Sequence, residues 1–322
     1  MSSLRSSQKI LPVRAPAWFS CPVKFPLLSA ALAAVLLSPA LPCSADDAPK
    51  WQKVLPSTPP GVTCLTREVV VYPEHTVTLL VYVPNVPKSY PAILDIHGGG
   101  WSQRQVEQDR PLAERLASQG FVTAIVSYRL STEAKYPAAL DDCKAAVRYM
   151  RKYADEMKID PARIGVIGGS AGGHLCSLLA MTNGLPEFEG KGPFQEQSSG
   201  VKACVVMAAS QDLVTAYADK TPDGAVTFFG GTREQKPEIY AEASPITHVR
   251  EGVPPTIFIE GEKDTAKIGR PEMMAKLKAL GIETDNFTLL NAPHPFWMSQ
   301  PWLDQTVEIA TKFFKKHLGE PK

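Results

Sequence analysis

Several features that mark specialised proteins are missing from this sequence. Its six cysteines in 322 residues include no C-x-x-C pair and no spacing typical of a zinc site. Lys and Arg (34) nearly balance Asp and Glu (33), and no basic cluster stands out after the first 45 residues. This pattern argues against nucleic acid or an anionic membrane surface as a partner. The chain has no internal repeat, and its 44% hydrophobic content is ordinary for a folded domain.

Acidic residues are absent from residues 1–45. An apolar run from Phe25 to about Leu41 is followed by Cys43-Ser44-Ala45, and the basic residues before it are Arg5, Lys9, Arg14 and Lys24. A basic, then apolar, then small-residue order predicts a secretory signal peptide cleaved near Ala45, and hence export to the periplasm or the exterior. The prolines inside this apolar run make it a poorer candidate for a membrane-spanning helix than for a signal peptide. Pro42 likewise disfavours a lipoprotein signal at Cys43.

Cleavage would change the charge and the cysteine count of the mature chain. Removing 4 of the 34 basic residues and no acidic residue leaves 30 against 33, a net charge of −3. The remaining cysteines are Cys64, Cys143, Cys176 and Cys204. An exported protein permits disulfides, but the spacing does not decide which of these residues pair, if any. Cys176 and Cys204 lie in apolar segments and are expected to be buried.

The segment Gly168-Gly169-Ser170-Ala171-Gly172 is the strongest indication of chemistry. It follows the apolar run Ile164–Ile167, and helix-forming residues begin at once behind it. Glycine two residues before and two residues after the serine removes the Cβ atoms that would collide in a sharp strand-to-helix turn. The alternative is a glycine-rich loop without a function. The pattern predicts an exposed nucleophile, Ser170, at the N-terminus of a helix.

A second glycine motif, His97-Gly98-Gly99-Gly100-Trp101, follows the apolar run Ala92–Ile96. Successive glycines leave backbone N–H groups unshielded, as an oxyanion-binding loop requires. We expect Gly99, Gly100 and Ala171 to provide those N–H groups, and His97 to brace the loop. Two such motifs in this order make a chance match of either one much less plausible.

Apolar segments of strand and helix length alternate through residues 67–322. This alternation predicts an α/β fold with a mostly parallel sheet covered by helices on both faces. Residues 46–66 are expected to be a linker or N-terminal arm, and residues 209–250 a small cap over the site. The loop Asn183–Gly200 is a candidate for the other wall of the cleft. The expected strands are 68–72, 76–83, 92–96, 121–128, 164–167, 201–208, 256–260 and 284–290, and the expected helices are 106–119, 138–157, 271–280 and 303–318.

A serine nucleophile needs a base, and three histidines follow Ser170. His294 lies in a proline-flanked loop after the last strand, which places it at the edge of the sheet where the glycine motifs lie. His174 is expected to point into the structure and to have a packing role. His248 precedes every suitable acid, which is the wrong order for a Ser–acid–His arrangement. His294 is therefore the predicted base.

The predicted acid is Asp264, which follows strand 256–260 and a glycine turn. Glu262 is a local rival, and Asp285 is disfavoured because it lies inside the next strand. Asp212, after strand 201–208, is the more serious alternative. The sequence orders these candidates but leaves them all open.

From about Leu79 to Leu318 the chain resembles α/β-hydrolase esterases of the hormone-sensitive-lipase-like and bifunctional feruloyl/acetylxylan esterase groups. The segments that carry the resemblance are His97–Trp101, Tyr128–Leu130, Pro137–Asp142, Ile159–Gly165, Gly168–Leu175, Ala243–Pro245 and Gly261–Asp264. The resemblance implies a serine esterase with a Ser170–Asp264–His294 triad and no metal or organic cofactor. The chain departs from the pattern after the acid, where Thr265–Gly269 lacks the usual apolar residue and proline.

The expected function is hydrolysis of short acyl esters, with acetyl or feruloyl esters of plant polysaccharide favoured by the resemblance. The aromatic residues Trp101, Phe296 and Trp297 are candidates for substrate binding, with packing of the core or cap as the competing interpretation. A general carboxylesterase or lipase-like enzyme is the alternative, and a non-catalytic binding protein or a serine peptidase is more remote. The partner is expected to be a small-molecule or polysaccharide ester. The oligomeric state stays open.

Overall fold

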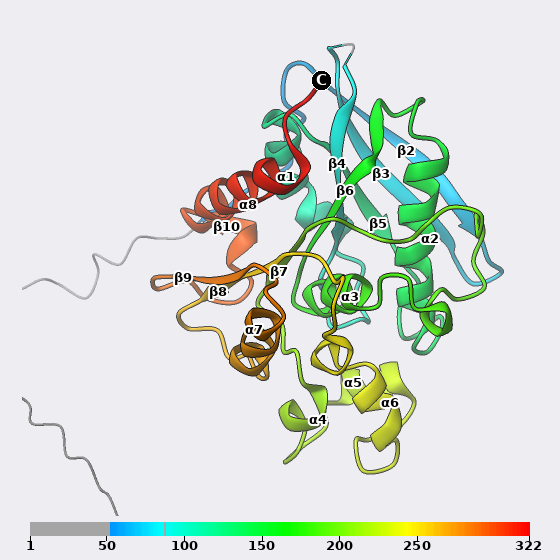
Figure 1. Ribbon diagram of the computed structural model, residues 1–322, viewed down its shortest axis with the longest axis vertical. Helices are drawn as coiled ribbons and strands as arrows, with labels where there is room; N and C mark the ends of the chain where they lie inside the picture. The colour runs from blue at the N-terminus through cyan, green and yellow to red at the C-terminus, as the bar shows by residue number, and fades with distance from the viewer. Residues whose placement is uncertain (1–51, 87) are drawn as a thin grey trace, which may run out of the picture. The chain divides into compact units, whose positions relative to one another are not determined.

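A computed structural model describes residues 52–86 and 88–322 (Figure 1). The predicted signal peptide, residues 1–45, lies outside the described residues. Within the described part, the main sheet has eight strands in the order β2-β3-β5-β4-β6-β7-β8-β9. These strands are β2 (Val62–Val71), β3 (Thr76–Pro84), β4 (Tyr90–Ile96), β5 (Val122–Ser127), β6 (Ile159–Gly169), β7 (Cys204–Met207), β8 (Thr256–Gly261) and β9 (Thr284–Leu289).

The sheet is parallel except at one edge. Strand β3 pairs antiparallel with both β2 and β5, whereas every pairing from β5 through β4, β6, β7 and β8 to β9 is parallel. Because parallel neighbours need a crossover, helices separate the strands and cover both faces. The principal helices are α1 (Val106–Ser118), α2 (Ala138–Lys152), α3 (Ala171–Met181), α7 (Arg270–Ala279) and α8 (Trp302–Leu318). The predicted α/β-hydrolase architecture is confirmed.

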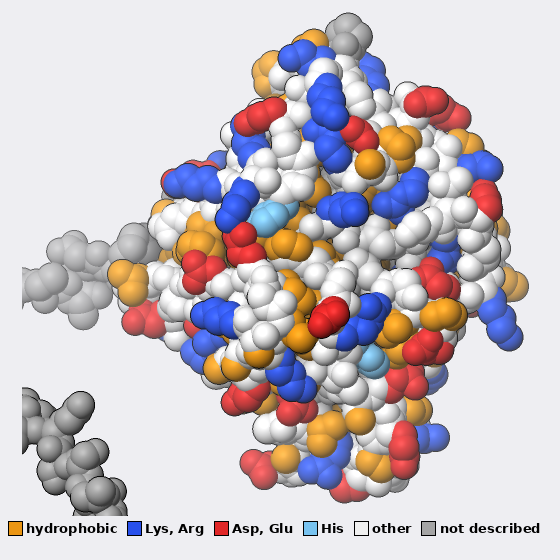
Figure 2. Space-filling view, viewed as in Figure 1, with side chains coloured by type: hydrophobic (Ala, Val, Ile, Leu, Met, Phe, Trp, Pro, Cys, Tyr) orange, Lys and Arg blue, Asp and Glu red, His pale blue; other side chains and the backbone are white. Residues whose placement is uncertain are grey.

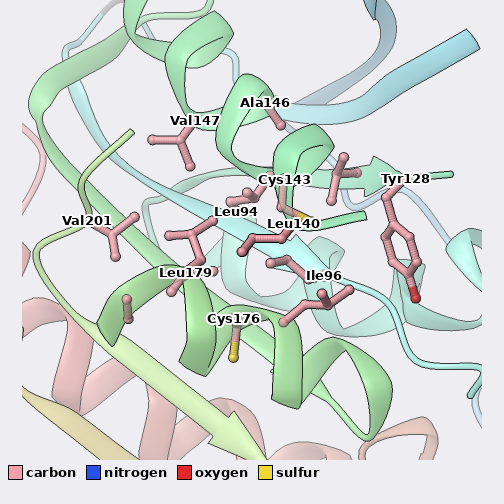
Figure 3. Close-up of a cluster of buried hydrophobic side chains, with 14 of the residues drawn as sticks. Leu94, Ile96, Tyr128, Leu140, Cys143, Ala146, Val147, Cys176, Leu179 and Val201 are labelled. Carbon is pink, nitrogen blue, oxygen red and sulfur yellow. The ribbon is translucent and has the colours of Figure 1, made fainter. Parts of the chain in front are cut away.

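Side chains of the central strands alternate between two hydrophobic clusters. In β4, Leu94 and Ile96 face the cluster formed with α2 and α3, where Cys143 and Cys176 are buried beside them (Figure 3). Ile93 faces the opposite cluster, formed with α1 and α8. This period of two with burial on both faces explains why the strands read as nearly continuous apolar runs.

Several predicted boundaries were wrong, and β6, for example, begins at Ile159 rather than at residue 164. The predicted arm 46–66 contains Gln52–Lys53 (β1), which pairs with Ser299–Gln300 (β10), and Val62 to Thr66 already belong to β2. Helix α2 ends at Lys152 rather than Met157, and turns connect it to β6. Met157 is nevertheless fully buried. Met157 is apolar because it is buried in the core, and not because helix α2 continues to it.

The insertion 209–250 forms a group of short helices between β7 and β8. Figure 1 shows α4, α5 and α6 together at the lower end of the drawing, next to α3 and far from β2. Phe228 and Phe229, at the end of α5, are buried and pack on Trp101. The inserted elements are α4 (Leu213–Ala216), α5 (Asp223–Phe229), α6 (Pro237–Glu242) and the 3₁₀ helix η3 (Pro245–His248).

Acidic and basic side chains are interspersed on the face shown in Figure 2, as the near balance of charges suggests. The four cysteines of the described part are free thiols, and the Sγ atoms of the buried Cys176 and Cys204 are 4.0 Å apart. Among residues 52–86 and 88–322, helices long and apolar enough to cross a membrane are absent. The same residues contain no group of three or more His, Cys, Asp or Glu side chains placed to hold a metal ion.

Candidate active site

Ser170 stands on a tight turn between β6 and α3. Its φ of 56° and ψ of −122° are strained for a residue with a side chain. The turn closes because glycines flank it on both sides: a Cβ atom at Gly168 would lie 2.5 Å from the Gly172 carbonyl oxygen, and one at Gly172 would overlap the carbonyl of Ile96. The backbone therefore holds the serine hydroxyl beyond the end of the sheet, as the motif predicted.

His294 connects Ser170 to Asp264. Its Nε2 atom lies 3.0 Å from Ser170 Oγ, and its Nδ1 atom lies 2.7 Å from Asp264 Oδ2. Burial opposes ionisation of Asp264, but hydrogen bonds from His294 and from the Ala266 N–H outweigh it and lower the pKa of the carboxyl group. An ionised carboxylate only accepts hydrogen bonds, so Nδ1 carries the proton. The Nε2 lone pair consequently faces the serine hydroxyl.

The rival acids have other partners. Glu262 accepts a hydrogen bond from the Asn291 N–H, within the loop that carries His294. Asp212 caps α4 by accepting from the Thr215 N–H and hydroxyl. Asp285 is exposed on β9 and accepts from the N–H of the next residue. Only Asp264, among the four candidates, lies against His294.

The rival histidines also lie elsewhere. His248 is hydrogen-bonded to the backbone carbonyl of Glu242, 2.6 Å away. His174 is buried one helical turn behind Ser170, where its Nε2 lies 2.7 Å from the Ala243 carbonyl oxygen. The sequence-based order of the histidines agrees with these positions.

The glycine loop after β4 is braced by His97. The imidazole stacks on the ring of Tyr128 with centroids 4.3 Å apart, and its Nδ1 donates to the Gly98 carbonyl at 2.7 Å. Burial lowers the pKa of His97 to about 4, which keeps the ring neutral. Gly99 and Gly100, the predicted N–H donors, have φ values of 106° and 58°, which glycine adopts without strain. Both lie beside Ser170 in the cavity lining.

Two cavities meet at Ser170 and Gly100. One, of about 220 Å³, also contains the third predicted donor, Ala171; we call it the Trp101 cavity. The other, of about 360 Å³, contains Gly99 and His294; we call it the His294 cavity. The remaining lining of the Trp101 cavity comprises Trp101, His174, Ala208, Ala209, Ser210, Leu213, Tyr217 and Ala266. That of the His294 cavity comprises Ser102, Gln103, Gln105, Gly224, Pro295 and Trp297.

The predicted wall formed by Asn183–Gly200 is wrong, because neither cavity contains a residue of this loop. The loop instead packs on α2, where the Glu189 carboxylate binds the fully buried Lys144 and Arg148. Insertion residues take the place of the expected wall: Leu213 and Tyr217 line one cavity, and Gly224 lines the other.

The three predicted substrate-binding aromatics have different environments. Trp101 is 8% exposed, stacks on Phe228 with centroids 4.9 Å apart and lines the Trp101 cavity. Trp297 lines the His294 cavity, and its indole N–H donates to Asp109 at 3.2 Å. Phe296 is fully buried in the cluster under α8 and lines neither cavity. The prediction for Phe296 is thus corrected: it is a core residue, because the turn after Pro295 directs it inward.

Sequence analysis missed a buried carboxyl pair beneath the glycine loop. Asp95 lies in β4 and Asp109 in α1. Both are fully buried, and neither oxygen of Asp95 has a hydrogen-bond partner among residues 52–86 and 88–322. Burial and the nearby Asp109 raise the pKa of Asp95 well above its ordinary value, and burial raises that of Asp109 to about 7. The signal was present, because Asp95 is the one charged residue in the run Ala92–Ile96.

The Asp95→Asn variant is expected to gain stability over the wild type as pH rises. The raised pKa means that the folded state keeps protons that the unfolded chain releases above its ordinary value of 3.8. The wild type therefore loses stability as the pH rises above about 4, by at most about 1.4 kcal/mol per pH unit for each proton, and the share of Asp109 is lost by about pH 7. Asparagine does not titrate, so the Asp95→Asn variant lacks the contribution of Asp95 to this loss of stability.

Urea denaturation of both proteins at pH 4.5 and pH 8 tests this expectation. The two free energies of unfolding should be similar at pH 4.5 and should diverge in favour of Asp95→Asn at pH 8. The Asp285→Asn variant is a matched control, because Asp285 is an exposed strand aspartate. A difference that does not grow with pH would show that Asp95 is ionised in the fold.

The BD-FAE family model matches residues 79–268, more than half of the chain, and this match identifies the family. The chain belongs to the BD-FAE family. The match contains the glycine loop, Ser170 and Asp264, and ends before His294. The predicted resemblance to this group of esterases is therefore confirmed.

Two curated relatives from Mycobacterium tuberculosis carry esterase names. One is a probable carboxylic ester hydrolase, LipM, 30% identical over 181 residues, which cover 54% of this chain and 41% of LipM. The other is esterase LipC, 31% identical over 186 residues, which cover 55% of this chain and 45% of LipC. The chain thus spans less than half the length of either relative.

Solved structures agree with the fold. Thermogutta terrifontis esterase 2 aligns with a TM-score of 0.67 at 25% identity over 81% of this chain and 96% of that protein. A bifunctional GH43-CE protein of Bacteroides eggerthii aligns with a TM-score of 0.67 at 26% identity over 78% of this chain and 38% of the other. A truncated carbohydrate esterase from gut microbiota (TM-score 0.68, 23% identity, 78% of this chain and 96% of the other) supports the fold alone.

Proposed function

We propose that this protein is a serine esterase that cleaves short-chain acyl esters through an acyl-serine intermediate. The observation that carries the proposal is the position of His294, whose two ring nitrogens contact Ser170 Oγ and Asp264 Oδ2. A hydroxyl group becomes a useful nucleophile only when a base accepts its proton, and this geometry provides that base. The esterase names of the relatives support the same chemistry.

In acylation, Ser170 Oγ forms a bond to the ester carbonyl carbon while His294 Nε2 takes the hydroxyl proton. The carbonyl oxygen becomes an oxyanion, for which the N–H groups of Gly99, Gly100 and Ala171 are the proposed donors. The carbon–oxygen bond to the alcohol then breaks, and the alcohol leaves with the proton from His294. Asp264 stabilises the imidazolium that forms between the two transfers.

Deacylation repeats these steps with water. His294 takes a proton from water, the hydroxide oxygen bonds to the acyl carbon, and the bond to Ser170 Oγ breaks. The proton returns to Ser170, which regenerates the free enzyme. The products are one carboxylic acid and one alcohol for each ester and water consumed.

The two cavities suggest how an ester lies in the site. His294 must protonate the leaving alcohol, so the alcohol belongs in the His294 cavity. The acyl group then occupies the Trp101 cavity on the other side of Ser170. Its volume of about 220 Å³ lies below the roughly 300–1,000 Å³ of pockets for drug-sized ligands. This size supports short acyl groups.

We further propose a carbohydrate as the alcohol. The His294 cavity is the larger of the two, and its lining combines the polar Ser102, Gln103 and Gln105 with Trp297. Polar hydrogen-bonding groups beside an aromatic ring suit a sugar, and a similar structure at 26% identity is described as a bifunctional GH43-CE protein. A general carboxylesterase is the second candidate, supported by the curated relatives.

A panel of esters separates these candidates. We expect p-nitrophenyl acetate and butyrate to be cleaved at least tenfold faster, in kcat/KM, than the octanoate, because the Trp101 cavity is small. Release of acetate from acetylated xylan would support a carbohydrate esterase, because its alcohol is a sugar hydroxyl. Dominant octanoate cleavage would support the general carboxylesterase, and inactivity on every ester would refute the proposal.

Export remains a proposal of its own, based on the composition of residues 1–45. Expression of the full chain in a bacterial host, followed by fractionation and mass spectrometry of the N-terminus, tests it. We expect a periplasmic product that begins near Asp46. An intact N-terminus in the cytoplasmic fraction would contradict the prediction.

A further inference from the structure

Trp297 lies between the base of the site and the turn that carries the nucleophile. Its indole ring is perpendicular to the His294 imidazole, with ring centroids 5.4 Å apart and an interplanar angle of 89°. A Cβ atom at Gly169 would overlap the indole, so the ring packs directly on the backbone next to Ser170. Only 1% of the Trp297 surface is exposed. Nearly all of this side chain therefore contacts protein.

The indole N–H anchors the ring at its far side. Trp297 Nε1 donates to Asp109 Oδ1 at 3.2 Å, and both side chains are buried. Asp109 belongs to the first turn of α1, directly after the glycine loop, whereas Trp297 belongs to the 3₁₀ helix η4 (Phe296–Met298), directly after His294. The hydrogen bond thus connects the two segments that follow the glycine loop and the base.

The hydrogen bonds of His294 leave one motion of its ring open. The bonds at Nδ1 and Nε2 act in the plane of the imidazole, so they resist displacement in that plane more than a tilt about the line that joins their partners. A perpendicular ring in contact with the imidazole opposes this tilt by sterics. The restraint matters most in the acyl-enzyme, where Ser170 Oγ has no proton to donate and Asp264 alone continues to hold the ring.

We propose that Trp297 and Asp109 are positioning residues for His294: their hydrogen bond fixes the indole against the imidazole and keeps Nε2 aimed at the atom whose proton it takes. This inference rests on the proposed esterase function. His294 transfers protons in both acylation and deacylation, so a loss of aim slows whichever step limits kcat.

A direct contact of Trp297 with the alcohol is the competing explanation, because Trp297 also lines the His294 cavity. The two explanations predict different kinetics. An alcohol contact changes KM and has effects that depend on the alcohol. A positioning residue lowers kcat in the same proportion for every ester of one acid. Asp109 lines neither cavity beside Ser170, so an effect of Asp109 cannot come from contact with the alcohol.

Trp297→Phe keeps an aromatic ring and removes the N–H. We expect kcat to fall about three- to tenfold, the range set by one hydrogen bond, with KM nearly unchanged. The factor should be the same for p-nitrophenyl acetate, followed by release of p-nitrophenol, and for ethyl acetate, followed in a pH-stat. An unchanged kcat, or a loss confined to one of the two esters, would overturn the inference.

Trp302→Phe is the matched control for the loss of a buried indole N–H. Trp302 is 4% exposed, lines neither cavity beside Ser170 and donates to the Leu290 carbonyl oxygen at 3.0 Å, at the start of the loop that carries His294. We expect kcat of this variant to stay within about twofold of the wild type. Equal losses in Trp297→Phe and Trp302→Phe would mean that both indoles act only through the stability of the loop, and the inference would fail.

Variants of Asp109 test the other half of the pair. Asp109→Ala removes the acceptor and should lower kcat by a factor similar to that of Trp297→Phe. Asp109→Asn, whose amide oxygen can still accept, should recover most of this loss. The double variant Trp297→Phe/Asp109→Ala should lose no more than the larger single loss, because both changes break one hydrogen bond. Losses that multiply, or no recovery in Asp109→Asn, would count against the proposal.

Thermal unfolding verifies that each variant is folded. If Asp109→Ala does not fold, the comparison of Trp297→Phe with Trp302→Phe decides the question alone. The wild type separates this inference from the function beneath it. If the wild type cleaves both acetates and Trp297→Phe matches it, only the inference fails. If the wild type is inert toward both acetates, the esterase proposal fails and the inference with it.

Discussion

Replacing Ser170 by alanine is expected to lower kcat about 10⁵–10⁶-fold on p-nitrophenyl acetate, the scale seen when a hydrolase loses its nucleophile. Alanine removes the oxygen that lies 3.0 Å from His294 Nε2 while the glycines of the turn stay in place. The fold should therefore persist. Steady-state kinetics, together with thermal unfolding to verify the fold, measure the effect.

Covalent labelling gives a second measurement of the same variant. A fluorophosphonate probe should modify the wild type at Ser170 and should not modify Ser170→Ala. Ser118→Ala is a suitable control, because Ser118 lies at the end of α1 and lines neither cavity beside Ser170. It should be labelled and active like the wild type. Labelling of Ser170→Ala would assign the nucleophile to another residue.

Replacing Asp264 by asparagine is expected to lower kcat by about 10³–10⁴-fold with little change in KM. The carboxylate now accepts from His294 Nδ1 and from the Ala266 N–H, which fixes the proton on Nδ1. An amide of the same shape can donate to Nδ1 and so favour the tautomer that has its proton toward Ser170. His294 would then have no lone pair on Nε2 to accept the proton of the Ser170 hydroxyl.

Glu262→Gln is the matched control for Asp264→Asn. Glu262 lies two residues away and holds the Asn291 N–H, in the loop that carries His294. The substitution turns a charge-assisted hydrogen bond of that loop into a neutral one, because the amide oxygen can still accept, and it does not touch the imidazole. We expect a change in kcat of less than tenfold. A similar drop in both variants would mean that Asp264 acts through loop structure and not through the tautomer of His294.

The glycine motifs show which parts of the site local sequence can predict. A sharp turn at Ser170 requires the absence of Cβ atoms at Gly168 and Gly172, and this demand involves contacts within a few residues and with the adjacent strand. The same is true of the N–H groups of Gly99 and Gly100, which need only a loop without side chains. Such local demands leave a recognisable pattern in the sequence.

The choice of the acid shows what the local sequence pattern does not predict. Asp264, Glu262 and Asp212 all follow strands at the same edge of the sheet, so position along the chain could order them but not separate them. The separation came from hydrogen bonds: Glu262 is bound to Asn291 and Asp212 to Thr215. These partners depend on how distant loops fold against one another.

The degree to which a side chain is buried was even harder to predict from the sequence. Trp101, Phe296 and Trp297 have the same aromatic character, yet two line cavities and Phe296 is enclosed by the core. The unpaired Asp95 and its neighbour Asp109 come from a strand and a helix that meet only in the folded chain. Neither environment has a local signature.

The sequence by itself determined the strand–helix alternation, the nucleophile turn, the glycine loop and the histidine that follows the last strand. Each depends on periodicity or sterics between near neighbours, which the order of residues records directly. Tertiary structure alone decided which acid contacts His294, which loop lines the cleft and which of the three aromatic residues is enclosed by the core. Those outcomes depend on packing between segments far apart in the chain, where a few ångströms separate a buried side chain from one that lines a site.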